Sequence, residues 1–181
     1  MIELITDLGH APDVAEVAAA TFPLACPPHS TPEDIAGFIR DNLAPSNFAR
    51  YILRAESDVL VARDVVGGPI IGYCLVKHDA PTHPDVAAVI TDRPVSEVSK
   101  MYVVPDHHAR GRSVAPSRAL MDAAIECARA NASVVVWLGV NQENERAQRF
   151  YTKMGFARVG VKTFDLNGSV EHDYVFAQRL D

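Results

Sequence analysis

The chain has 181 residues, of which 48% are hydrophobic and 22% charged, and its formal net charge at pH 7 is −6. This composition is ordinary for one folded domain, which we expect to span residues 1–181, and it excludes intrinsic disorder. The acidic balance and the lack of a long basic stretch exclude a general nucleic-acid binder. The sequence shows no apolar run of about eighteen residues and no secretory pattern, so we expect a cytoplasmic protein without membrane contact.

Cysteine and histidine spacing argues against a metal or disulfide framework. Cys26, Cys74 and Cys127 form no Cys-x-x-Cys pair, which predicts free thiols. The histidines lack the spacing that would bring them together with carboxylates or thiols, so we predict no metal site. Cys26 could face a substrate or act as a nucleophile, but no histidine or aspartate is spaced to activate it, and packing is the preferred interpretation.

Hydrophobic periodicity predicts the elements of the first half of the chain. Pro12 and the segment Thr31-Pro32-Glu33-Asp34 are typical of helix starts, and Gly67-Gly68 is typical of a hairpin turn. The proline-containing segments 22–30 and 79–94 predict irregular loops. The predicted elements are a strand over 2–7, helices over 11–22, 33–43 and 46–53, and strands over 58–66 and 68–78.

The second half alternates strands and helices and ends in a hairpin. Gly155 fits a left-handed residue that stops a helix, and Asn167-Gly168 fits a tight turn. The strand-helix-strand order over 97–140 predicts a parallel crossover, and ligands usually bind at the carboxyl ends of such strands. The predicted elements are strands over 97–104 and 133–140, helices over 116–131 and 144–154, and a hairpin over 157–180.

A basic turn joins the predicted strand 97–104 to the next helix. Residues 107–120 read HHARGRSVAPSRAL and contain three arginines but no acidic residue. Small residues let a backbone approach an anion, and the free N–H groups of a helix start attract phosphate. The turn therefore predicts an anion site, with a solvated surface loop as the alternative. The residues concerned are Arg110, Gly111, Arg112, Ser113, Ala115, Ser117 and Arg118.

Two motifs resemble the GCN5-related N-acetyltransferases. Residues 110–115, RGRSVA, are similar to the pyrophosphate loop R/Q-x-x-G-x-G/A of that family, with Ser113 where the family prefers glycine. A second register, Arg112-x-x-Ala115-x-Ser117, is the alternative. Residues 137–156, WLGVNQENERAQRFYTKMGF, resemble its N-x-x-A-x-x-F-Y-x-x-x-G-F pattern. The matching residues are Asn144, Ala147, Phe150, Tyr151, Gly155 and Phe156.

The resemblance implies an α/β fold of the GCN5-related type. Its sheet is mixed and mostly antiparallel, splayed between two central parallel strands, with helices on both faces. It also implies acetyl-CoA as co-substrate, with the pantetheine arm inserted between the parted strands and bonded to main chain from Met101 to Val104 and from Leu138 to Asn141. The cofactor-binding residues implied are Met101, Tyr102, Val103, Val104, Arg110, Gly111, Arg112, Ser113, Val114, Ala115, Ser117, Asn141, Asn144, Ala147 and Tyr151.

Direct transfer of an acetyl group to an amine needs an acid and a base. By resemblance, Tyr151 reaches the sulfur and protonates the leaving thiolate. Glu97 is the candidate base that deprotonates the amine through a water, and a main-chain N–H near Val103 would hold the oxyanion. The alternatives are an ordinary half-buried aromatic for Tyr151, an exposed strand carboxylate for Glu97, and a simple helix cap for Asn144, which is compatible with a pantetheine contact.

The expected acceptor is a primary amine of a small molecule. Short segments such as T-P-E-D at 31–34 and W-L-G-V at 137–140 resemble the bacterial branch that acetylates polyamines or related amines. The alternatives are a protein N-terminus or lysine side chain as acceptor, or an acyl-CoA-binding sensor without turnover. A monomer or a homodimer is expected. The candidate acceptor residues are Phe22, Cys26, His29, Phe38, His78 and Glu97.

Overall fold

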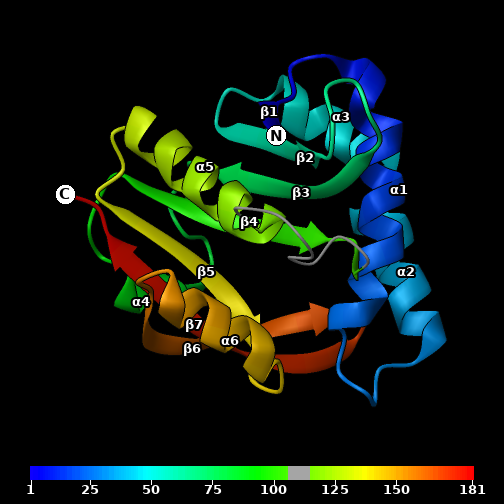
Figure 1. The fold of residues 1–181 in the computed structure, drawn as a ribbon. Coiled ribbons are helices and arrows are strands. Elements are labelled where there is room, and N and C mark those ends of the chain that lie inside the picture. Colours follow the sequence, from blue (N-terminus) through cyan, green and yellow to red (C-terminus); the bar gives the residue numbers. More distant parts are fainter. Residues whose placement is uncertain (106–114) are drawn as a thin grey trace.

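The structure is a computed structural model that describes residues 1–105 and 115–181. The strands of these residues form one seven-stranded sheet in the order β1-β2-β3-β4-β5-β7-β6 (Figure 1). They are β1 (Ile2–Leu4), β2 (Ser57–Arg63), β3 (Ile70–Lys77), β4 (Val95–Val103), β5 (Val135–Asn141), β6 (Ala157–Leu166) and β7 (Ser169–Arg179). The α-helices are α1 (Ala11–Thr21), α2 (Pro32–Asn42), α3 (Pro45–Leu53), α4 (Pro84–Val89), α5 (Pro116–Ala130) and α6 (Glu145–Lys153).

The sheet is antiparallel except at its centre, where β4 and β5 run parallel. These two strands pair only from Val95↔Val135 to Glu97↔Trp137. Beyond that point β4 continues to Val103 beside β3, and β5 continues to Asn141 beside β7. The predicted mixed sheet that splays between two central parallel strands is therefore confirmed.

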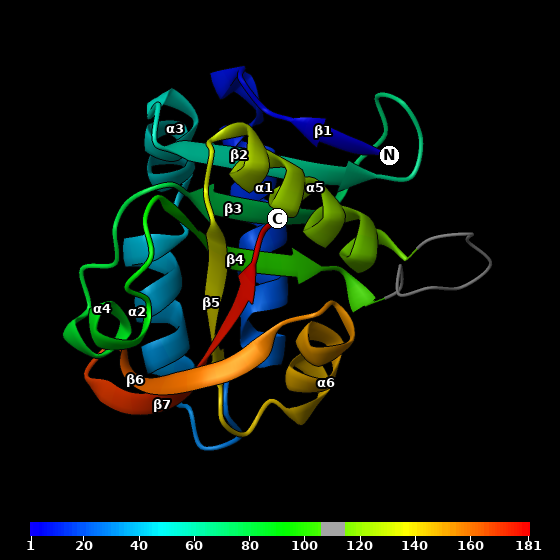
Figure 2. The ribbon, with the colours of Figure 1, turned by 90° about the vertical axis from the view of Figure 1, so that its left-hand side faces the viewer.

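Helices cover both faces of the sheet, because apolar side chains alternate along its strands. One face, with Val98 and Val136, packs against α5 and α6. On the other face α1 and α3 pack over β2 and β3, α2 packs against β6, and α4 packs near the start of β5 around Trp137. Figure 2 shows the sheet between these two helical layers.

Three predicted segments differ from the structure. The segment 22–30, expected as a loop, begins with the 3₁₀ turn Phe22–Ala25. The segment 79–94, expected as a loop, contains α4, because Pro84 opens the helix, His83 caps it by accepting from the Asp85 N–H, and Val86 is buried. The first strand ends at Leu4 rather than at residue 7, where Asp7 instead caps a short 3₁₀ helix by accepting from Gly9.

The predicted turns after α6 and between β6 and β7 are confirmed. Gly155 has φ 92°, the left-handed conformation that a helix stop requires, and Phe156 is buried with its ring centroid 6.2 Å from that of Tyr151. Asn167 and Gly168 both have positive φ, as a tight hairpin turn requires. Across the part of the chain that the structure describes, every helix is too short or too polar to cross a bilayer.

Candidate functional site

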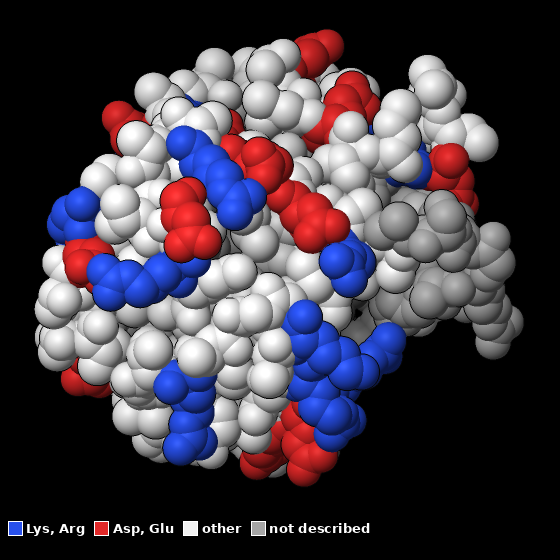
Figure 3. Space-filling model, turned by 60° about the vertical axis from the view of Figure 1, so that its left-hand side comes forward, with Lys and Arg blue, Asp and Glu red and all other residues white. Residues whose placement is uncertain are grey.

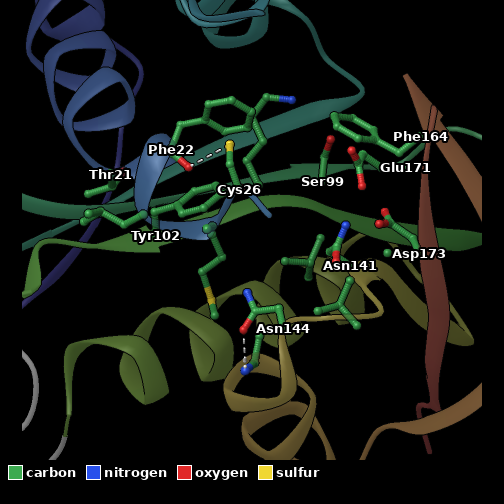
Figure 4. Close-up of a pocket in the computed structure, with 18 of the residues that line it drawn as sticks. Thr21, Phe22, Cys26, Ser99, Tyr102, Asn141, Asn144, Phe164, Glu171 and Asp173 are labelled. Atoms are coloured by element: carbon green, nitrogen blue, oxygen red, sulfur yellow. Dashed lines mark hydrogen bonds between the residues drawn. The ribbon is translucent and has the colours of Figure 1, made fainter. Parts of the chain in front are cut away.

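A cavity of about 1010 Å³ opens where β4 and β5 part. Its walls come from both strands, from α6, from the first turn of α5, and from the opposite layer of α1, α2 and the β6–β7 hairpin. Figure 4 shows side chains from these elements converging on it. The predicted site residues that line it are Phe22, Cys26, Phe38, Glu97, Met101, Tyr102, Val103, Ser117, Asn141, Asn144, Ala147 and Tyr151.

The structure does not bring every predicted residue to this cavity. Val104 donates its N–H to the Ile71 carbonyl and lies beside a separate hollow near the N-terminus. Ala115 is the N-cap of α5 and is not part of the lining. The predictions for residues 110–114 lie outside the described residues.

His78 is a correction to the expected acceptor set. Its ring bonds to Ser96 at 2.7 Å and to Asp58 at 3.1 Å, at the end of the sheet where β4 and β5 are still paired. Asn131, just after α5, also lies 3.2 Å from the ring. The antiparallel register of β3 and the alternation of its side chains decide where the His78 ring lies. The order of elements along the sequence did not reveal this position.

The parted strands form the wall that faces α6. Beyond Glu97 and Trp137 the edges of β4 and β5 that face one another are not paired, so main-chain N–H and C=O groups border the cavity from both sides. An extended chain with amide groups can bond to such edges as an added strand does. The unpaired edges of β4 and β5 can therefore bind an extended arm with amide groups, such as pantetheine.

The N-terminus of α5 opens at the mouth of the same cavity. Ser117 lines it, and the N-cap Ala115 supplies no side-chain hydrogen bond to the first turn. The free N–H groups and dipole of a fifteen-residue helix therefore favour an anion here. Arg146 of α6 also lines the cavity, and Figure 3 shows Lys and Arg side chains gathered beside a hollow over this part of the surface.

Helix α6 presents one face to the cavity. Asn144 caps the helix by accepting the Ala147 N–H at 3.0 Å, and it lines the cavity together with Ala147 and Tyr151. The predicted cap is therefore confirmed. The ring of Tyr151 packs against Phe150 and Phe156, and burial, with Tyr102 and Cys74 as neighbours, raises the pKa of its hydroxyl above the ordinary range. This phenol stays protonated at neutral pH and can only donate its proton to a strong acceptor.

Aromatic rings line the opposite wall. Phe22 and Phe38 stack with centroids 4.5 Å apart and planes 10° apart, and Phe164 meets Phe38 edge-on at 5.4 Å. Tyr102 lies edge-on to Phe22 at 6.5 Å. These rings make an apolar surface that comes from α2, β4, β6 and the 3₁₀ turn Phe22–Ala25.

Two contacts close the cavity on the side away from α5. His29, in the proline-rich segment before α2, bonds through Nε2 to Oε1 of the buried Glu171 at 2.9 Å. Helix α2 also approaches the tip of the β6–β7 hairpin so closely that a Cβ on Gly37 would lie 2.6 Å from Nδ2 of Asn167. The glycine thus allows the helix and the hairpin to meet over the cavity.

Charged side chains are paired across its floor. Lys77 lies 3.9 Å from Glu97, and Lys162 lies 3.1 Å from Asp173. The side chain of Lys162 crosses β7 and reaches β5 at Gly139, where a Cβ would collide with the lysine Cε and would lie 2.9 Å from Oδ2 of Asp173. Burial raises the pKa of Asp173, and Lys162 opposes that shift.

Lys100 is on the same floor because of a bulge in β4. Leu75 pairs with Lys100 and Val76 with Val98, so Ser99 is an extra residue in the strand. Leu75 belongs to the cluster under α1, α2 and α3, and its partner Lys100 therefore projects to that side. Burial, reinforced by Lys77, lowers the pKa of Lys100 from 10.5 to about 8.

Cys26 lines the cavity as a thiol. Its Sγ donates to the Phe22 carbonyl at 3.4 Å, and burial, with Glu171 nearby, raises its pKa to about 11. The thiolate form is therefore disfavoured at neutral pH, which supports packing over nucleophilic attack.

Sequence reasoning missed several lining residues that lie on strands. The apolar alternation of residues 97–104 includes Lys100 but gives no sign of the bulge, and β6 and β7 were recognised only as a hairpin. Gly139, inside an otherwise apolar strand, was the one available signal of a close approach. The missed residues that matter most for charge and shape are Lys77, Ser99, Lys100, Lys162, Phe164, Glu171 and Asp173.

Comparison with known proteins gives a consistent picture. A family model described as "Acetyltransferase (GNAT) family" matches residues 13–156. An uncharacterized N-acetyltransferase of Mycobacterium tuberculosis strain H37Rv is 42% identical over 171 residues, which cover 94% of this chain and 97% of that protein.

Two solved structures share the fold. The crystal structure of the PaiA N-acetyltransferase from Thermoplasma acidophilum in complex with coenzyme A has a TM-score of 0.74 at 18% identity, covering 99% of both chains. The structure of yncA, a putative acetyltransferase from Salmonella typhimurium with its cofactor acetyl-CoA, has a TM-score of 0.64 at 19% identity. It covers 100% of this chain and 94% of that one.

Proposed function

This chain belongs to the acetyltransferase (GNAT) family and is an acetyl-CoA-dependent N-acetyltransferase, and we propose that it acetylates the primary amine of a small molecule. The observation that carries the choice of a small acceptor is a pair of contacts that restrict the cavity on the side away from α5. His29 bonds to Glu171 on one side, and α2 meets the hairpin tip at Gly37 and Asn167. A groove that admits a lysine within a protein segment would have to be open at both ends.

The residues present fit acetyl-CoA. The parted edges of β4 and β5 can bond to the pantetheine amides, with Met101, Tyr102 and Val103 on one side and Asn141 on the other. Asn144 and Ala147 can border the arm along α6, and the open first turn of α5 suits the diphosphate. The pyrophosphate loop predicted over 110–115 is part of this proposal.

When bound, acetyl-CoA supplies the acetyl group as a thioester. In direct transfer the amine nitrogen forms a bond to the carbonyl carbon, the carbon–sulfur bond breaks, and one proton of the ammonium is released to solvent. The enzyme's own residues must therefore remove protons from the nitrogen and deliver one to the sulfur. Holding both substrates together in one cavity provides much of the rate acceleration in such a reaction.

We assign the base to Glu97 and the acid to Tyr151. Glu97 lines the cavity beside Lys77, at the point where the central strands part. Its carboxylate can take the proton of the amine through a water. Tyr151 approaches from α6 as a protonated phenol. The departing thiolate would take the phenol proton within the same cavity.

The test is a panel of small amines, including polyamines, and of peptides, assayed with acetyl-CoA by thiol release and mass spectrometry. We expect acetyl-CoA to raise the melting temperature and at least one small amine to be acetylated faster than any peptide. Faster acetylation of a peptide N-terminus or lysine would contradict the small-molecule acceptor. Thermal stabilisation by acetyl-CoA without thiol release on any amine would show a sensor without turnover, and no stabilisation would contradict acetyl-CoA binding.

A further inference from the structure

The charged side chains that line the cavity differ in whether they already have a partner. Each acidic side chain that lines it has a partner, and His29, Lys77 and Lys162 hold Glu171, Glu97 and Asp173 respectively. The remaining acid, Asp165, accepts the Gly168 N–H at the hairpin turn. The carboxylates are therefore already neutralised or hydrogen-bonded before a substrate enters.

Lys100 is the exception. Its ammonium makes no hydrogen bond or ion pair with any residue in the described ranges 1–105 and 115–181, although it lines the cavity and is partly buried. Two further lysines of the cavity floor, Lys77 and Lys162, disfavour its charge, and Glu97 only partly offsets them. An unpaired buried charge is costly to a folded protein unless a ligand supplies its counter-ion.

The position of Lys100 suits contact with the acceptor rather than with the thioester donor. It is three residues along β4 from the proposed base Glu97, and the bulge at Ser99 turns it toward the side of α1 and α2. The unpaired edges of β4 and β5 lie in the plane of the sheet and are left for the donor arm. Phe22, with its ring edge-on to Tyr102, lies on the same side of β4 as Lys100.

We propose that the acceptor is an amino acid, whose carboxylate pairs with the ammonium of Lys100 while its amine lies near Glu97 and its side chain contacts the ring stack of Phe22 and Phe38. This inference rests on the proposed function, since it names the substrate class of the same cavity. It disfavours a polyamine, because a second ammonium at this place would meet the like charge of Lys100. A charge-assisted bond to one buried ammonium accounts for a preference of about ten- to a hundredfold.

The experiment measures kcat/KM for the twenty amino acids, for the amides and decarboxylated amines of those that react, and for polyamines. It uses the wild type, Lys100→Met, Lys100→Arg, and Lys153→Met as a control on the exposed end of α6. We expect the wild type to prefer amino acids over the matched amides and decarboxylated amines by at least about tenfold. Lys100→Met should abolish that preference by lowering kcat/KM for the amino acids to the value for the decarboxylated amines, whereas Lys100→Arg should retain part of the preference and Lys153→Met all of it.

A binding measurement separates failure of this inference from failure of the proposed function. Amino acids are titrated into each variant saturated with coenzyme A, with calorimetry as the readout and without turnover. Binding that Lys100→Met abolishes would support the inference even if no acetylation were seen. Three outcomes would overturn the inference. They are equal binding of amino acids by the wild type and Lys100→Met, a preference for polyamines, and an equal loss of turnover on all amines in Lys100→Met. The last outcome would instead give Lys100 a role in the chemical step.

Discussion

At the residue scale, the phenol of Tyr151 shows how position and burial together prepare a group for proton donation. It lies on the cavity face of α6, seven residues after the capping Asn144, and its ring is held by Phe150 and Phe156. Burial raises the pKa of the hydroxyl, so the proton is present throughout the range in which the enzyme can be assayed. The hydroxyl can be removed without disturbing the ring packing.

We therefore predict that Tyr151→Phe lowers kcat by about 10²- to 10⁴-fold, the usual contribution of a positioned general acid. The affinity for acetyl-CoA should change little, because Phe retains the ring. Steady-state kinetics and a calorimetric titration with coenzyme A give the two numbers. An unchanged kcat would remove the acid role from Tyr151, and a matching loss of affinity would make it a binding residue instead.

The buried ammonium of Lys100 should affect the stability of the folded protein. Its pKa is about 8 in the folded protein against 10.5 ordinarily, so the unfolded chain binds more protons between these values and stability from this group rises with pH there. Below pH 8 the full cost of the buried charge is present. Lys100→Met should therefore stabilise the ligand-free protein at pH 7 by about 1 to 3 kcal/mol.

The stabilisation by Lys100→Met should decrease as the pH rises from 8 toward 10.5, because the lysine becomes neutral there and its burial no longer costs the free energy of a buried charge. Thermal unfolding of both proteins at pH 7 and pH 10 measures it, with a shift of roughly 2 to 4 °C for each kcal/mol in a chain of this size. Lys153→Met, on an exposed helix end, should stay within about 0.5 kcal/mol of the wild type. A destabilised Lys100→Met protein at pH 7 would mean that the lysine has a stabilising partner.

At the element scale, the acceptor side depends on the contact between α2 and the β6–β7 hairpin. Gly37 faces the side chain of Asn167, whose positive φ is fixed by the turn. An added methyl group at residue 37 has to displace the side chain of Asn167 or move the helix or the hairpin. Both carry acceptor-side residues, namely Phe38 and Phe164.

We predict that Gly37→Ala raises KM for the acceptor several-fold more than it raises KM for acetyl-CoA, because the displaced elements border only the acceptor side. Gly9→Ala is the matched control, since a Cβ there would meet the Asp7 carboxylate at an ordinary 3.4 Å and at negative φ. Initial-rate kinetics with each substrate varied in turn distinguish the two effects. Equal changes in both KM values would show that the contact acts on the whole fold.

At the scale of the whole molecule, the cavity depends on how the two parts of the sheet are joined. The central strands share only the pairs from Val95↔Val135 to Glu97↔Trp137, and the apolar cluster under α5 and α6 spans both sides of that junction. The sheet can therefore be open at one end and firmly packed at the other. A ligand that enters the opening adds bonds to both strands at once.

We predict that coenzyme A slows amide hydrogen exchange in two segments that are remote in sequence, 98–103 and 138–141, by about tenfold or more. Strand β1 (Ile2–Leu4), at the far edge of the sheet, should exchange at an unchanged rate. Mass spectrometry of peptic fragments gives the measurement. Protection of one segment alone would mean that the arm does not lie between the strands.

The sequence by itself determined the elements and the local site on α6. The cap at Asn144, the spacing to Ala147 and Tyr151, the stop at Gly155 and the turn at Asn167 depend on residues close in the chain, so periodicity and backbone preferences were enough to find them. The short helix α4 was missed because Pro84, which begins it, is typical of loops as well as of helix starts. The family resemblance supplied the splayed sheet, which local patterns do not encode.

Only the tertiary structure decided the acceptor side. Lys100 projects into the cavity because a bulge opposite β3 sets its direction, and Glu171 arrives there because β7 inserts between β5 and β6. His78 was expected at the acceptor and instead joins Asp58 and Ser96 at the closed end of the sheet. Strand register and bulges depend on how segments that are distant in sequence bury whole faces of the sheet. A shift of one residue exchanges the two faces of a strand. Short-range patterns therefore cannot determine the register or the bulges.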